Sequence, residues 1–281
     1  MKNYLIIGAI LFSTSAIADS LTILNSGSKT GGFSMQATAY SQDLADEFNV
    51  TLVNPGDRCV ALGNLLPKID GPVLMPWASD YEAVGRDGAC VTYDINQGTV
   101  VRYDTSPVYV CSRGGNISKD SGKVAHTVPA DGPLARVILE FNNEFGTSHT
   151  PVVYDGSGDA RLAIINGEVD YALLSKKHTG IVIEADPSIN CDVSLAASGL
   201  NSLPASTGNE KIAFGFDTVW IIINADSDLT DKIKMSMMEN HLNCESAIGT
   251  WSKCNTTLNS RWDLTAEEVN KNWETMVATQ R

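Results

Sequence analysis

An α/β fold made of two lobes is what the sequence predicts, and three observations indicate it. Short apolar runs alternate with helical segments of ten or more residues, which favours mostly parallel strands with helices on both faces. The alternation is interrupted near residue 105 and then restarts, so the same βαβ unit occurs twice. A long apolar run at 216–224 indicates that the chain then returns to its first half. Two α/β lobes joined by crossing strands are the simplest architecture.

The first half of the chain supplies short buried strands, each followed by a polar loop and a helical stretch. The turn at 54–57 (NPGD) and the pair Asp70-Gly71 separate these segments. The expected strands cover 21–24, 50–53 and 72–75, and the expected helices cover 33–48 and 59–66.

A different pattern begins near residue 99. Residues 100–103 and 108–111 alternate between apolar and polar side chains, as the two strands of a hairpin do. The strand–helix alternation then restarts. The expected strands cover 124–128, 151–154, 170–174, 193–197 and 216–224, and the expected helices cover 132–145 and 160–166.

The C-terminal segment is expected to be helical. Thr265 and Glu268 have the spacing of a capping box, and Val269 and Trp273 share one face of the helix that follows. This face is expected to pack on the core. The expected first lobe comprises 19–105 and 217–281, and the expected second lobe comprises 106–216.

The first eighteen residues are typical of a secretory signal peptide. A short positive start is followed by an apolar run at 4–12 and by small residues before a cut after Ala18. The run is shorter than the ~20 residues that span a bilayer. The mature chain is therefore expected to be soluble in the periplasm.

The charge of the chain argues against polyanionic partners. Lys and Arg total 20 against 33 Asp and Glu, for a net charge of −13. Binding to nucleic acid or to an anionic membrane requires clustered cations that neutralise phosphates. We therefore expect no nucleic-acid partner, and an anionic ligand would have to be held by a local pocket.

Six cysteines in an exported chain indicate structural disulfides, because that compartment is oxidising. Six cysteines allow 15 pairings, and the sequence does not choose among them. Cys244 and Cys254 are the best candidate pair, since closing so short a loop would stabilise the fold by roughly 2–3 kcal/mol. Zinc is the alternative, but the cysteines lack paired short spacings and a nearby histidine pair. We expect no metal site.

Three loops that follow predicted strands are rich in glycine and serine: 26–33, 77–79 and 154–159. Glycine lets backbone N–H groups approach a ligand, and a helix N-terminus favours negative charge by ~0.3–1 kcal/mol. This combination suits a carboxylate or a phosphate. The alternative is that each loop is only a tight turn. Lys29 is either a cation above a ligand cleft between the two lobes or a solvated loop lysine.

The sequence carries no convincing catalytic motif. Residues 26–29 match S-x-x-K and 29–31 match K-T-G, but the two overlap in one loop and no S-D-N triplet exists. No G-x-S-x-G elbow is present, and the four histidines lack a metal-ligand or triad spacing. We therefore expect no catalytic residues and no cofactor. A secreted serine hydrolase acting through Ser26 or Ser28 remains an alternative.

One segment resembles a known family. Residues 154–170 (YDGSGDARLAIINGEVD) resemble the Y-K-G-x-x-x-A-x-x-x-L-L-x-G-x-V-D segment of the tripartite tricarboxylate transporter receptors, the Bug-type periplasmic binding proteins. Residues 53–56 (VNPG) and 70–75 (DGPVLM) are similar to the family's V-x-N-R-P-G turn and D-G-Y-T-L-L strand, and Gly31-Gly32 lies where the family has a Gly-rich loop. Lys29 and Arg58 depart from the family pattern.

The resemblance implies a type II periplasmic-binding-protein fold with a ligand cleft between the lobes. It further implies capture of a small di- or tricarboxylate and its delivery to the subunits of a membrane permease, by a monomeric receptor. A sensor component that presents ligand without transport is the alternative. Together with Lys29 from the loop analysis, the implied ligand-binding residues are Ser28, Thr30, Gly31, Gly32, Ser79, Ala130, Asp131, Gly132 and Asp170 or Ser175. Trp77 is a further candidate, which either walls the cleft or packs in the core.

Overall fold

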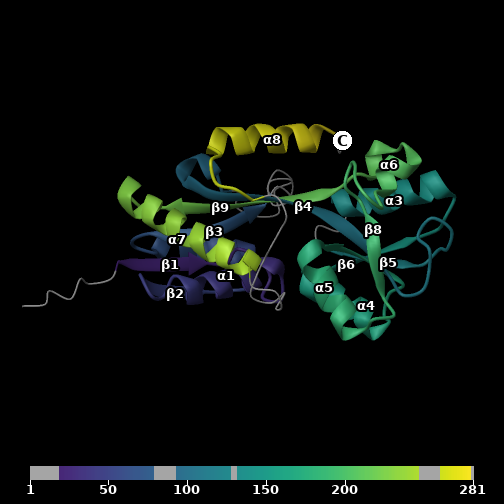
Figure 1. The fold of residues 1–281 in the computed structure, drawn as a ribbon, viewed down its shortest axis with the longest axis horizontal. Helices are drawn as coiled ribbons and strands as arrows, with labels where there is room; N and C mark the ends of the chain where they lie inside the picture. The colour runs from purple at the N-terminus through teal and green to yellow at the C-terminus, as the bar shows by residue number, and fades with distance from the viewer. Residues whose placement is uncertain (1–18, 79–92, 128–131, 247–259, 280–281) are drawn as a thin grey trace, which may run out of the picture.

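The computed structural model describes residues 19–78, 93–127, 132–246 and 260–279. The expected signal peptide, 1–18, lies outside the described residues. Within the described ranges, no helix is both long and apolar enough to cross a membrane. Figure 1 shows two α/β lobes side by side along the long axis of the molecule, connected by strands that run from one lobe into the other.

The first lobe is built on three parallel strands. β1 (Ser20–Leu24) pairs with β2 (Asn49–Val53) on one side and with β3 (Val73–Ala78) on the other. Helix α1 (Gly32–Asp43) follows β1, as the sequence predicts, but ends earlier than expected. The helix expected at 59–66 is a π-helical turn at Val60–Leu65 followed by a 3-10 turn at Leu66–Lys68.

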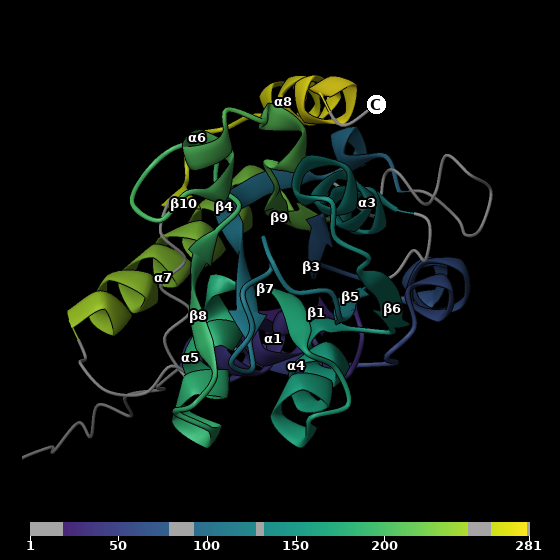
Figure 2. The same cartoon turned by 90° about the vertical axis from the view of Figure 1, so that its right-hand side faces the viewer.

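The second lobe repeats the parallel arrangement. β5 (Lys123–Thr127) lies between β6 (Thr150–Tyr154) and β7 (Tyr171–Ser175) and is parallel to both. Figure 2 shows α3 (Pro133–Phe145) and the short α6 (Leu203–Thr207) on one side of these strands. On the other side lie α4 (Ser157–Asn166) and α5 (Lys176–Ala185).

Two long strands connect the lobes. The hairpin expected at 100–111 is in fact one strand, β4 (Thr99–Ser112). β4 pairs antiparallel with β9 (Gly215–Ile223) up to Pro107 and with β7 from Val108 onward, so the chain stays extended where a turn was expected. Proline at this position is tolerated because its missing N–H falls where the pairing partner changes. The sheet is therefore mixed, with order β2-β1-β3-β9-β4-β7-β5-β6.

Two further strands flank β4. β10 (Ser260–Arg261) pairs with its first half, and β8 (Asn190–Ser194) pairs with its second half. A disulfide between Cys111 and Cys191 joins β4 to β8 inside the second lobe. The expected pair Cys244–Cys254 lies outside the residues whose side chains are described and stays a prediction.

Both faces of each half-sheet are covered by helices. Along β3, Met75 and Trp77 pack on one face, and Leu74 packs on the other. α1 and α7 (Ser227–Ser246) cover the Leu74 face, and α8 (Ala266–Thr279) covers the Trp77 face. In the second lobe, α3 covers one face, while α4 and α5 cover the other. This layering follows from strands that are apolar on both sides.

The last helix begins as the sequence predicts. The backbone N–H of Thr265 donates to the Glu268 carboxylate at 2.8 Å, and the N–H of Glu268 donates to the Thr265 hydroxyl at 3.2 Å. Val269 and Trp273 are buried beneath the helix. The capping box and the core-facing side of this helix are therefore confirmed.

Candidate functional site

A cavity of about 110 Å³ lies between the two lobes, at the carboxyl ends of the parallel strands. This edge is where open α/β sheets bind ligands. At ~10–15 Å³ per water, the cavity has room for a ligand of roughly ten non-hydrogen atoms. Both lobes and both crossing strands contribute to the lining, which consists of Gly27, Ser28, Gly31, Gly32, Phe33, Gln36, Ala78, Asp104, Ser106, Thr127, Asp155, Gly156, Ser157, Ser175, Phe216 and Thr218.

The N-termini of three helices meet at this cavity. Gly31, Gly156 and Ser175 are the N-cap residues of α1, α4 and α5, and each lines the cavity. None of the three caps its helix with a side-chain hydrogen bond. The first N–H groups of a helix have no intrahelical partner and carry partial positive charge. The three helices therefore bring the positive ends of their dipoles to the same small volume, from both lobes, with no side-chain cap at their N-cap residues.

The lobes touch each other beside the cavity. The hydroxyl of Thr30, in the loop before α1, donates to the carboxylate of Asp159 in α4 at 3.1 Å. A methyl group added at Gly158 would lie 2.1 Å from the carbonyl oxygen of Thr30, and one added at Gly156 would lie 2.0 Å from the Ser28 hydroxyl. Both glycines allow a close approach of the two backbones. The two lobes are thus in direct contact at this point.

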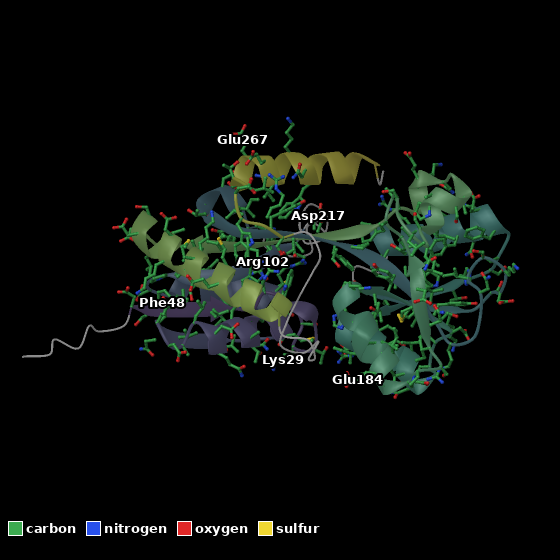
Figure 3. The ribbon with its side chains drawn as sticks, in the orientation of Figure 1. Lys29, Phe48, Arg102, Glu184, Asp217 and Glu267 are labelled. Carbon is green, nitrogen blue, oxygen red and sulfur yellow. A yellow bond between two sulfur atoms is a disulfide. The ribbon has the colours of Figure 1, made fainter. Side chains whose placement is uncertain are left out.

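The charged side chains of the lining are both acidic. Asp104 and Asp155 line the cavity, and the described lining contains no lysine, arginine or histidine. Arg102 is buried in the first lobe next to Asp104. Figure 3 shows Arg102 close to the crossing strands. Its Nε donates to Oδ1 of Asp104 at 2.9 Å, and both side chains are 2% exposed. A bound anion would therefore be held by backbone dipoles and hydroxyl groups.

The Arg102–Asp104 pair belongs to a buried cluster. The Ser260 hydroxyl donates to Oδ1 of Asp104 at 2.6 Å, and Arg102 donates to that hydroxyl at 3.0 Å. Arg102 also donates to the Tyr40 hydroxyl. Burial opposes the charge of Arg102, but Tyr40 and Asp104 more than compensate and raise its pKa above the ordinary value. The guanidinium therefore stays charged and fixes the position of Asp104.

Within the described part of the chain, three buried polar atoms on lining residues have no hydrogen-bond partner: Oδ2 of Asp104, Oε1 of Gln36 and Oγ of Ser175. All three side chains are more than nine-tenths buried. A buried polar group without a partner costs ~1–3 kcal/mol. All three residues line the same cavity, which favours a site whose polar groups are completed by a ligand.

The structure brings four of the sequence-predicted site residues together at the cavity: Ser28, Gly31, Gly32 and Ser175. Thr30 lies at the contact between the lobes and not in the lining. Lys29 is exposed, and its stem lies against Gly56 of the neighbouring turn. Figure 3 shows Lys29 at the lower edge of the molecule, where the two lobes meet.

Three other predicted residues lie away from the cavity. Trp77 is fully buried in the core, where it makes an edge-to-face contact with Tyr93, because its side chain points to the opposite face of β3. Asp170 precedes β7, at the opposite end of the strand from Ser175, and accepts the Lys123 N–H at 2.8 Å. Gly132 is the N-cap of α3 but is not part of the lining. The remaining candidates, Ser79, Ala130 and Asp131, lie outside the described residues.

Sequence reasoning missed several lining residues. Asp104, Ser106, Phe216 and Thr218 come from the crossing strands, where no motif marks them. Gln36 lies one helical turn after Gly32 in α1 and is buried. The available sequence signal was a polar residue one turn after the glycine pair. The loop at 154–159 was recognised as a possible anion site, and three of its residues reach the cavity, namely Asp155, Gly156 and Ser157.

The structure gives the catalytic alternative no geometric support. The hydroxyl of Ser26, the candidate nucleophile, donates to the carbonyl oxygen of Pro76 at 2.5 Å. Ser28 faces the N-terminus of α4. Burial lowers the pKa of His126, whose Nδ1 contacts the carbonyl of Thr127 at 2.9 Å. Among the described residues, no group of three or more His, Cys, Asp or Glu side chains is placed to hold a metal ion.

The fold thus has two α/β lobes, crossing strands and a cavity between the lobes at the carboxyl strand ends. Neither a family model nor a curated protein sequence matches the chain. Solved structures do match, over nearly its full length.

A structure described as a periplasmic transporter superposes with a TM-score of 0.70 at 13% identity, covering 95% of this chain and 96% of the other. MatC from Rhodopseudomonas palustris, solved with bound malate, gives a TM-score of 0.64 at 13% identity, and the match covers 95% of this chain and 100% of MatC. The periplasmic binding protein BugD gives a TM-score of 0.62 at 11% identity, and the match covers 94% of this chain and 95% of BugD. The resemblance to Bug-type proteins is therefore confirmed at the level of the fold.

Proposed function

We propose that this chain is an extracytoplasmic solute-binding protein that captures a small carboxylate in the cavity between its lobes. The observation that carries the proposal is the convergence of three uncapped helix N-termini, from α1, α4 and α5, on a cavity of about 110 Å³. Helix N-termini are general anion sites. The bound malate in MatC, a protein of the same fold, supports a carboxylate as the anion.

The proposal includes the setting in which the protein works. The segment 1–18 is a signal peptide cleaved after Ala18, and the mature protein is a periplasmic monomer that delivers its ligand to the subunits of a membrane permease. Support comes from the residue pattern of that segment and from the fold shared with periplasmic binding proteins.

We also propose that the two lobes move as separate bodies, with 19–105 and 217–281 as the first lobe and 106–216 as the second. Support comes from β4, whose partner changes from β9 to β7 between Pro107 and Val108, within a few residues of the proposed boundary. Binding would then close the lobes around the ligand, as in other hinged binding proteins.

Thermal unfolding of the mature protein with a panel of small carboxylates tests the function. A ligand present at a hundredfold excess over its Kd stabilises by ~2.7 kcal/mol, which corresponds to a rise in Tm of roughly 5–10 °C for a chain of this size. The neutral amide of each acid is the matched control and is expected to give no shift. A folded protein whose Tm is unchanged by every acid in the panel would contradict the proposal.

A further inference from the structure

We propose that the ligand carries, besides its carboxylate, a hydrogen-bond donor that Asp104 accepts, and that the site rejects the matched acid without that donor. This inference rests on the proposed function and narrows its substrate class to hydroxy acids and amino acids. It is carried by the geometry of one buried carboxylate on the wall of the cavity.

The two oxygens of Asp104 have different surroundings. Oδ1 accepts from Arg102 at 2.9 Å and from Ser260 at 2.6 Å, so its hydrogen-bonding capacity is used inside the first lobe. Oδ2 is buried, has no partner, and belongs to a residue that lines the cavity. The cluster with Arg102 and Ser260 holds the carboxylate in place. Oδ2 is therefore a fixed acceptor that lacks a donor.

A second acceptor belongs to another lining residue of the first lobe. Oε1 of Gln36, in the second turn of α1, is also buried without a partner, and Gln36 is 3% exposed. Buried polar groups are nearly always hydrogen-bonded in folded proteins. Two unpartnered acceptors from the first lobe therefore indicate that the occupant brings at least one N–H or O–H group.

The cavity thus has two chemically different parts. The starts of α1, α4 and α5 offer N–H donors for a carboxylate, and the hydroxyl of Ser175 adds one more. Asp104 and Gln36 offer acceptors. A carboxylate placed against Asp104 would meet a like charge, and no cation lines the described part of the cavity to relieve it. A molecule with a carboxylate at one position and a hydroxyl or amino group at another satisfies both parts.

Two series of acids that share a carbon skeleton test this directly. Succinate, malate and aspartate differ at one carbon by hydrogen, hydroxyl and ammonium, and butyrate, 2-hydroxybutyrate and 2-aminobutyrate repeat the series with one carboxylate. Sites built to hydrogen-bond a hydroxyl or amino group reject the analogue lacking it by several orders of magnitude. In calorimetric titrations of the mature protein, we expect a donor-bearing member to bind at least about a hundredfold more tightly than its parent acid. Comparing the affinities of the hydroxy acid and the amino acid within each series then shows whether the donor is a hydroxyl or an ammonium group.

Two variants test whether Asp104 causes the preference for the donor-bearing acid. Asp104→Asn keeps the shape of the side chain and removes its charge, so the preference for the donor-bearing acid is expected to fall at least about tenfold. Ser260→Ala is the matched control, because it disturbs the same buried cluster through Oδ1 and leaves Oδ2 unchanged. This control is expected to retain the wild-type preference. Circular dichroism shows whether each variant is folded. If Asp104→Asn does not fold, the wild-type affinities for the two series of acids test the inference by themselves.

The outcomes separate the inference from the proposed function. Equal affinity for a parent acid and its hydroxy and amino derivatives would overturn the inference and leave carboxylate binding intact. An undiminished preference in folded Asp104→Asn would overturn the role of Asp104. Failure of every acid in both series, and of the wider carboxylate panel, would overturn the proposed function and the inference with it.

Discussion

Asp217 lies beside the binding cavity, in β9 between the lining residues Phe216 and Thr218. Burial raises the pKa of this carboxyl to about 6, although a hydrogen bond from Tyr103 acts in the opposite direction. The unfolded chain releases the same proton near the ordinary value of 3.8. The folded state therefore binds more protons between these two values, and its stability falls as the pH rises through that window.

Replacing Asp217 by Asn is expected to stabilise the protein at pH 7–8, because the variant no longer buries a negative charge. A shift of two pKa units corresponds to ~3 kcal/mol, and we expect about 2 kcal/mol because the side chain is partly exposed. The gain should disappear as the pH falls below about 4, where the carboxyl is protonated in both states. Urea unfolding across this range measures the effect. Asp231→Asn, an exposed position on α7, is the control, and a gain that is independent of pH would contradict the explanation.

At the scale of single residues, the sequence predicted the part of the cavity lining that local chemistry marks. Gly31, Gly32 and Ser28 lie in a Gly/Ser-rich loop, and such a loop before a helix has a physical reason to approach an anion. Asp104 had no local signal, since it occupies one position of a long strand and reaches the cavity only because two strands cross there. For Trp77 the sequence left a cleft wall and a core position open, and the structure places the side chain in the core.

The N-terminus of α4 is the element on which closure depends. Gly156 and Gly158 approach the loop of the first lobe closely, and under the proposed lobe motion this contact would be lost on opening. An alanine at Gly158 would place Cβ 2.1 Å from the Thr30 carbonyl oxygen, a backbone atom that cannot rotate away as a side chain would. Alanine is also a better helix former than glycine, by ~1 kcal/mol. The substitution therefore opposes closure without weakening the helix.

We expect Gly158→Ala to bind its ligand at least about tenfold more weakly than the wild type, with an unliganded Tm that is unchanged or higher. Calorimetry gives the affinity, and small-angle scattering should show a more open particle. Leu162→Ala changes an exposed position of the same helix and serves as the control. Wild-type affinity in Gly158→Ala would show that the contact between Thr30 and α4 is not part of the bound state.

At the scale of elements, strands and helices with a strong local pattern were predicted well. The capping box of α8 and the βα units around β1 and β6 appear within a few residues of their expected positions. The hairpin expected at 100–111 was wrong because Pro107 reads locally as a turn, whereas pairing with β9 and β7 keeps the strand extended. α5 and α7 were not predicted. α7 is mostly polar, and α5 joins a polar start at 176–179 to a short apolar run at 181–183, so neither shows a clear helical period.

At the scale of the whole molecule, repetition of the βαβ unit was enough to predict two lobes. Each lobe buries its own core on both faces of a half-sheet, and the crossing strands β4 and β9 connect the lobes (Figure 1). The pairing of Cys111 with Cys191 could not be predicted, because 80 residues separate the two cysteines and only the crossing of β4 beside β8 brings them together. Long-range contacts of this kind have no signature in local sequence.

The central claim is that helix N-termini from both lobes hold the carboxylate of the ligand in the cavity. A crystal structure of the complex with the most tightly binding acid of the panel tests this claim most directly. The account predicts carboxylate oxygens about 2.7–3.2 Å from the backbone nitrogens at the starts of α1, α4 and α5. A ligand bound outside the cavity, or one whose carboxylate is held by lysine or arginine side chains, would contradict it.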